Sequence, residues 1–189
     1  MIKFIESEFE NIAENFKKLK NSSNKIAQIS EICIESLKNG NKIIFCGNGG
    51  SAADSQHLAA ELVGRYKKNR PAIASIALTT DTSNITAIGN DFGYDTIFER
   101  QVEALGKQGD VLVGISTSGN SKNVVLAFEK AKKMGITTIA FTGQKGGKMK
   151  ELADITLNVP SDITNNIQEM HIASGHLICG IIENEVCCE

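Results

Sequence analysis

The stretch KIIFCGNGGS, residues 42–51, joins an apolar run to a glycine-rich turn and indicates the fold class. Residues 42–46 are mostly apolar on both sides of an extended chain, as in a strand buried on both faces. The glycines that follow permit positive φ and close backbone approach, and Ser51 can cap a helix. Strand, glycine turn and helix in this order predict a unit of a parallel α/β sheet.

The same alternation continues along the chain. Four further apolar runs predict strands at residues 74–78, 111–115, 136–141 and 155–159. Helical patterns lie between or after them, at residues 52–66, 82–89, 95–106, 121–134 and 163–185. Since such strands are buried on both sides, helices must cover both faces of the sheet. We expect an α/β fold with three αβα layers and a five-stranded parallel sheet, preceded by helices.

The first 39 residues predict two helices ahead of the sheet. Apolar residues recur at intervals of 3 and 4 and form a heptad stripe of Ile2, Ile5, Phe9, Ile12, Phe16 and Leu19. A second helical pattern follows the cap-rich break at residues 21–24 and stops at Asn39-Gly40. A narrow stripe suits subunit association as well as packing within the chain. We expect one domain over residues 1–189, with 1–39 as a helical extension involved in oligomerisation.

The composition excludes several classes of protein. With 20 Lys and Arg against 22 Asp and Glu, the chain offers no broad cationic surface, which argues against nucleic acid or membrane partners. Its apolar runs are too short to span a bilayer, and its amino terminus turns polar at once, so we expect the cytoplasm. The five cysteines lack paired CxxC spacing and predict reduced thiols, with Cys187 and Cys188 in a frayed helix end rather than a redox pair.

Two strand-to-helix turns predict a site for a phosphate group. The second turn, residues 116–121 (STSGNS), places four hydroxyls at a helix amino terminus, where free N–H groups and the helix dipole bind anions without lysine. Neither turn has the Gly-Lys-Ser/Thr ending of a Walker A motif. Gly47, Gly49 and Ala52 satisfy a relaxed dinucleotide pattern, but Asp81 comes too late for the usual ribose contact. Both turns follow parallel strands, whose carboxyl ends receive ligands.

An ordered set of motifs resembles the phosphoheptose isomerases, or sedoheptulose 7-phosphate isomerases, of the sugar isomerase (SIS) group. The motifs are GNGGS at 47–51, His57 with Glu61, GRY at 64–66, GNDFG at 89–93, STSGNS at 116–121, and QEMH at 168–171 with His176. The resemblance covers nearly the whole chain and implies a Rossmann-like SIS domain. It also implies interconversion of sedoheptulose 7-phosphate and D-glycero-D-manno-heptose 7-phosphate, the entry to bacterial activated heptoses for lipopolysaccharide or capsule. Homotetramers with active sites at subunit interfaces would be expected.

The resemblance also assigns roles to individual residues. Phosphate binding would fall to Ser116, Thr117, Ser118 and Ser121. The sugar would contact Asn48, Gly49, Gly50, Ser51, Glu61, Asn90, Asp91 and Gln168. Glu61 and His176 would form the acid/base pair, and one zinc ion would be held by His57, Glu61, Gln168 and His176. The chain departs from the family pattern at Asn165, where an aspartate is expected.

The chemistry of aldose–ketose exchange suits these residue types. A carboxylate such as Glu61 can take the carbon-bound proton, and an imidazole such as His176 can serve the oxygens of an enediol. His57 and Glu61 share one helix face, and imidazole with carboxylate suits zinc. Gln168 and His176, however, are eight residues apart, about 12 Å along a straight helix. We therefore expect either a distortion near Gly175 or ligands from different subunits.

Two other functions remain open at this point. A SIS fold can be a non-catalytic binding module, such as the replication-initiator-associating factor of some bacteria, but such a module does not require the acid/base pair Glu61 and His176. A reductase would require nicotinamide binding. His171, about one turn from Gln168, is expected to be structural.

Overall fold

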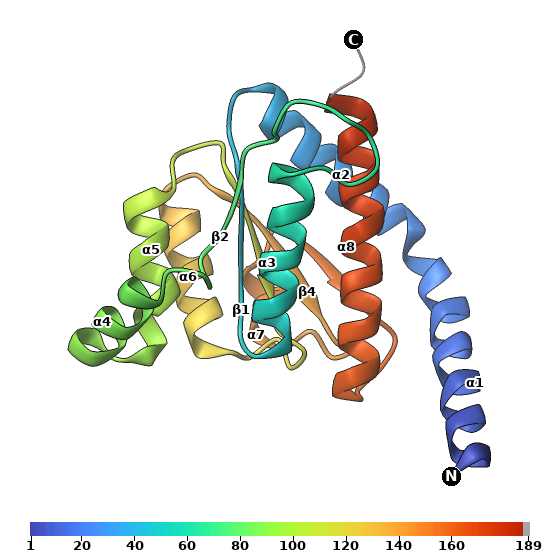
Figure 1. Cartoon of the computed structure of the whole chain (residues 1–189). Coiled ribbons are helices and arrows are strands. Elements are labelled where there is room, and N and C mark those ends of the chain that lie inside the picture. Colours follow the sequence, from blue (N-terminus) through green and yellow to red (C-terminus); the bar gives the residue numbers. More distant parts are fainter. Residues whose placement is uncertain (187–189) are drawn as a thin grey trace.

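The computed structural model describes residues 1–186 and contains a five-stranded sheet with helices on both faces (Figure 1). The strands are β1 (Ile43–Gly47), β2 (Ser75–Ala77), β3 (Val111–Ile115), β4 (Thr137–Thr142) and β5 (Ile155–Asn158). Their order is β2-β1-β3-β4-β5, and every neighbouring pair is parallel. The predicted α/β class is confirmed, and the bounds of all five strands agree with the prediction to within one residue.

Helices form the two outer layers. The helices within residues 1–186 are α1 (Ile2–Leu19), which lies mostly outside these layers, α2 (Ser23–Lys38), α3 (Gly50–Val63), α4 (Thr82–Phe92), α5 (Ile97–Leu105), α6 (Lys122–Lys133), α7 (Gly147–Leu152) and α8 (Thr164–Val186), with 3₁₀ turns η1 (Lys20–Ser22) and η2 (Tyr94–Thr96). One core lies between the sheet and α2, α3 and α8, and a second lies between the sheet and α5, α6 and α7. The sequence pattern did not predict α7, which has only six residues.

The strand order changes direction between β1 and β3, which places the two predicted phosphate turns side by side. Gly47 pairs with Ile115, so the turns that follow them start at the same level of the sheet. A Cβ at Gly47 would lie 2.7 Å from the backbone oxygen of Ser51, so this turn requires glycine. The cap predicted at Ser51 is wrong: the N-cap is Gly49 at φ +56°, and Ser51 is buried inside α3.

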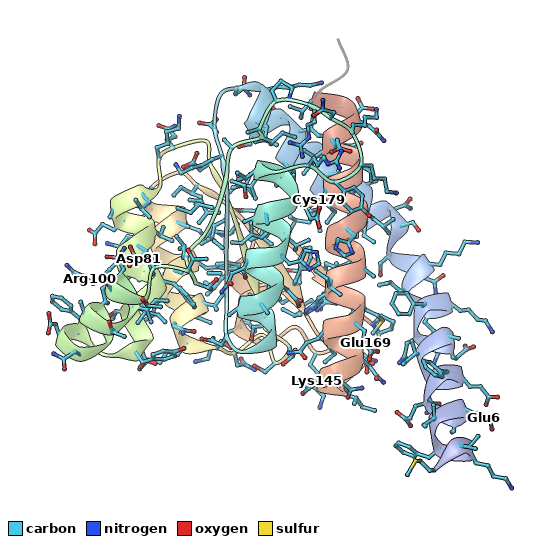
Figure 2. All side chains as sticks on the ribbon, viewed as in Figure 1. Glu6, Asp81, Arg100, Lys145, Glu169 and Cys179 are labelled. Carbon is cyan, nitrogen blue, oxygen red and sulfur yellow. The ribbon has the colours of Figure 1, made fainter. Side chains whose placement is uncertain are left out.

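The amino-terminal part of helix α1 stands clear of the sheet and its layers (Figure 1), and Glu6 lies in this part (Figure 2). Only Leu19 of α1 is buried, while apolar side chains stay exposed at Ile2, Phe4, Ile5, Phe9 and Phe16. None of the helices within residues 1–186 is long and apolar enough to cross a membrane. Cys33, Cys46 and Cys179 are buried free thiols, and Cys179 on α8 (Figure 2) contacts the backbone oxygen of Leu58 on α3. The expectation for Cys187 and Cys188 concerns residues outside the described range.

Candidate active site

Three hydroxyls of the turn after β3 converge at the start of α6. The Oγ of Ser116 lies 2.8 Å from that of Ser121 and 3.4 Å from that of Ser118. Ser121 is the N-cap of α6, and its hydroxyl pairs with Ser116 instead of capping the helix. Since the first N–H groups of a helix attract anions, this cluster of hydroxyls forms a suitable phosphate cradle.

The shape of this turn depends on Gly119. Its φ is +65°, and a Cβ there would collide with the backbone oxygen of Gly146. The turn therefore packs closely against the start of α7, and the N–H of Met149 donates to the Gly119 carbonyl. Thr117, which is half-buried, accepts a hydrogen bond from the N–H of Gly143 through its backbone carbonyl. These contacts hold the cradle against α7 and against the loop that joins β4 to α7.

A second cluster joins α3 to α8. The Nε2 of His57 lies 3.0 Å from Oε1 of Glu61, one turn later on α3, and 3.2 Å from Nε2 of His176 on α8. The three ligand atoms all lie within 4.8 Å of one another. Two imidazole nitrogens and a carboxylate oxygen at this separation suit a zinc ion.

The electrostatics of His176 fit a metal ligand. Burial, followed by the neighbouring His57, lowers the pKa of His176 below its ordinary value, and the Glu61 carboxylate offsets this in part. The imidazole is therefore neutral at pH 7, which is the form that binds metals. The ring of Tyr66 stacks on His176 with centroids 5.7 Å apart and an interplanar angle of 24°.

Gln168 lies apart from this cluster. A Cβ at Gly50 would lie 2.5 Å from Nε2 of Gln168, so Gln168 packs against the first turn of α3. His57 lies further along the same helix, about 10 Å from Gly50 measured along the helix axis. Helix α8 runs without interruption through Gly175, so the expected distortion there is wrong. Gly175 instead lets α8 approach α3, since its Cβ would meet Leu58 at 2.5 Å. The other expectation, that two subunits supply the ligands, stays a prediction.

Apart from Glu61 and Gln168, described above, the residues expected to contact the sugar lie in two places. Asn48 and Gly49 form the turn before α3, Gly50 is the first residue of this helix, and Ser51 is buried in its first turn. Asn90 and Asp91 are exposed at the end of α4, where Asn90 donates to the Asp91 carboxylate at 2.8 Å. The two places are connected by Tyr94, whose hydroxyl donates to Oδ1 of Asn48 at 3.1 Å.

The sequence patterns missed several residues that support the site. Tyr66 is the last residue of the GRY motif, and Tyr94 directly follows the GNDFG motif. Their places in or next to motifs could have marked them as site residues. Asn123 at the start of α6 and Glu183 near the end of α8 had no such signal, because their partners are more than 70 residues away along the chain. Buried contacts of this kind follow from the fold rather than from local spacing.

The chain is similar to several known proteins along most of its length. The family model described as the SIS domain matches residues 8–143. A phosphoheptose isomerase from Akkermansia muciniphila is 61% identical over 186 residues, with 98% of each chain covered. The structure of phosphoheptose isomerase GmhA from Neisseria gonorrhoeae superposes with a TM-score of 0.91 at 44% identity, covering 96% of this chain and 98% of that one. A phosphoheptose isomerase from Francisella tularensis gives a TM-score of 0.94 at 39% identity, covering 97% and 98%.

Proposed function

Since the chain belongs to the SIS-domain family and to its phosphoheptose isomerases, we propose that it interconverts sedoheptulose 7-phosphate and D-glycero-D-manno-heptose 7-phosphate. This reaction would supply heptose biosynthesis, for lipopolysaccharide or capsule. The observation that carries the proposal is that one chain holds a hydroxyl cradle at α6 and a carboxylate with an imidazole between α3 and α8.

The two clusters divide the reaction between them. The hydroxyls of Ser116, Thr117, Ser118 and Ser121 would bind the phosphate and so fix the substrate's position. Glu61 would take the proton from one carbon and return it to the neighbouring carbon, while His176 would move the proton between their oxygens through an enediol. Asn48, Gly49, Gly50, Ser51, Asn90, Asp91 and Gln168 would contact the sugar.

We also propose one zinc ion in each site. His57, Glu61 and His176 would hold it, because their ligand atoms already converge. Gln168 of a second copy of the chain is the proposed fourth ligand. When bound, zinc supplies Lewis acidity that polarises the substrate oxygens and stabilises negative charge on them.

A homotetramer with sites at its subunit interfaces is the proposed assembly, and the exposed apolar stripe on α1 supports it. Residues 1–39 would then be an extension of the single SIS domain that serves oligomerisation. The buried free thiols Cys33, Cys46 and Cys179 are compatible with a reducing compartment, and we propose the cytoplasm.

The alternative is a non-catalytic SIS protein that binds sugar phosphates or regulates replication initiation. Incubation of the purified protein with sedoheptulose 7-phosphate and zinc, followed by NMR of the sugar products, separates the two. We expect the aldose to accumulate to an equilibrium mixture. If no aldose forms, the protein is a binding module and the proposed reaction is wrong.

A further inference from the structure

Asn48 and Asn123 form a reciprocal pair of hydrogen bonds across the switch point of the sheet. Nδ2 of Asn48 donates to Oδ1 of Asn123 at 2.9 Å, and Nδ2 of Asn123 donates to Oδ1 of Asn48 at 2.8 Å. Asn48 follows β1 and is half-buried, whereas Asn123 lies in the first turn of α6 and is only 3% exposed. The pair therefore joins the glycine turn to the helix that carries the phosphate cradle.

A backbone N–H group determines the orientation of the two side-chain amides in this pair. The N–H of Val124, which also donates to the Ser121 carbonyl, donates to Oδ1 of Asn123 at 3.0 Å. If the Asn123 amide were reversed, its NH₂ would face this N–H and two donors would oppose each other. Asn123 must therefore present its NH₂ to Asn48, and Asn48 must present its oxygen in return.

The remaining hydrogen-bonding capacity of Asn48 follows from a simple count. Its oxygen has two lone pairs, and these accept from Asn123 and from the hydroxyl of Tyr94 at 3.1 Å. Its NH₂ has two hydrogens, and one is donated to Asn123. What stays free is a single N–H donor, which can recognise an oxygen acceptor but cannot accept from a hydroxyl hydrogen.

We propose that Asn123 and Tyr94 are positioning residues that hold the Asn48 amide so that it offers the substrate one N–H donor and no acceptor. The acceptor would be a hydroxyl or carbonyl oxygen of the sugar, since Asn48 belongs to the sugar part of the site in the proposed function, on which this inference rests. Orienting the amide before the substrate arrives removes the cost of ordering it on binding.

A double-mutant cycle tests this assignment. Asn123→Leu has a similar volume and removes the pair without adding charge, and Asn48→Ala removes the residue that Asn123 is said to orient. We expect each single variant to lower kcat/KM about tenfold, as for the loss of one well-oriented hydrogen bond. On the Asn48→Ala background, Asn123→Leu should change kcat/KM by less than about twofold. If the two losses multiply, Asn123 acts independently of Asn48 and the proposal is overturned.

Further variants and a binding measurement separate the proposed effect on Asn48 from misfolding and from a change in the phosphate cradle. Tyr94→Phe keeps the ring and removes one donor, so it should lower kcat/KM several-fold only when Asn48 is present. Asn21→Leu, the same change as Asn123→Leu at an exposed position of η1, should leave kcat/KM unchanged. The Kd of inorganic phosphate should stay within about twofold in Asn123→Leu. A parallel loss of phosphate affinity would show that Asn123 supports the cradle, which contradicts the proposal.

Calorimetric binding of sedoheptulose 7-phosphate repeats the cycle without turnover. If the wild type binds the sugar phosphate and shows the coupling between Asn48 and Asn123 but forms no aldose, the proposed reaction fails and the positioning role stands. If the wild type turns over while the losses in affinity multiply, the positioning role fails and the reaction stands. A wild type that does not bind the sugar phosphate contradicts both.

Discussion

His171 and His176 lie five residues apart on α8 but meet different surroundings. His176 is partly exposed and contacts His57 and Tyr66. His171 is fully buried beside Phe141, with ring centroids 5.7 Å apart, and both of its ring nitrogens lack a hydrogen-bond partner among the described residues. Burial lowers the pKa of His171 to about 4. The expectation that His171 is structural agrees with this position in the core.

The buried imidazole predicts a pH dependence of stability. In the unfolded chain His171 has its ordinary pKa near 6.5. Between pH 6.5 and 4 its imidazole is therefore protonated in the unfolded state but neutral in the folded state. The free energy of unfolding should therefore fall as pH drops through this window, by about 2 kcal/mol at pH 5. In His171→Gln the contribution of His171 to this decrease should be absent, so stability should fall less with pH than in the wild type, although the variant is less stable at pH 7. Urea unfolding at pH 7 and pH 5 measures the difference, and equal decreases in both proteins would contradict the account.

At this scale, the sequence predicted residues that carry functional groups within motifs and missed those that orient them. His57 and Glu61 were expected on one face of a helix, and the structure brings both to His176 on another element. Asn123 could not be found in this way, because its partner Asn48 lies 75 residues away and only the pairing of β1 with β3 brings them together.

Helix α8 is connected to the segment after α3 through a buried carboxylate. The side chain of Glu183 accepts hydrogen bonds from the backbone N–H groups of Tyr66, Lys67 and Lys68 at 2.8 to 2.9 Å and pairs with Arg70 at 3.1 Å. Burial opposes ionisation, but these hydrogen bonds and the Arg70 charge lower the pKa of Glu183 below its ordinary value. The carboxylate thus holds Tyr66 where its ring stacks on His176.

Removing this charge should destabilise the fold. Glu183→Gln leaves the guanidinium of Arg70, which is 2% exposed, without its counter-ion, so we expect the free energy of unfolding to fall by about 3 kcal/mol. Glu185→Gln makes the same change at an exposed position of the same helix and should have an effect below about 0.5 kcal/mol. Chemical denaturation compares the two variants. Equal stabilities would show that Glu183 does not anchor the segment.

The sequence predicted the presence of most helices and strands better than it predicted the residues at which helices begin. Short apolar runs between turns marked all five strands, because a strand covered by helices on both faces needs apolar side chains on both. Ser51 was expected to cap α3, but Gly49 reaches a positive φ that starts the helix two residues earlier. The uninterrupted α8 shows that Gly175 serves close helix packing, which spacing along one helix cannot distinguish from a bend.

The whole molecule leaves most of the stripe on α1 exposed in one chain, since Leu19 is the one buried residue of this helix. Phe9, 66% exposed, lies near the middle of this stripe. Phe9→Glu should weaken association, because in the proposed assembly it places a charge among apolar side chains that would pair between copies. Sedimentation should give about four times the 20.3 kDa of one chain for the wild type and smaller species for the variant. Asn11→Glu, which adds the same charge at an exposed position outside the stripe, should keep the wild-type mass. A monomeric wild type would contradict the proposed assembly.

The central claim is that a hydroxyl cradle and the pair Glu61 and His176 act on opposite ends of one sugar phosphate. The most direct measurement compares binding and turnover of sedoheptulose 7-phosphate by Glu61→Gln, with calorimetry for the Kd and NMR for the aldose. We predict an affinity within about threefold of the wild type, because the cradle is intact, and turnover at least 100-fold slower, because the amide cannot take the carbon-bound proton. Turnover at the wild-type rate by this variant would contradict the account.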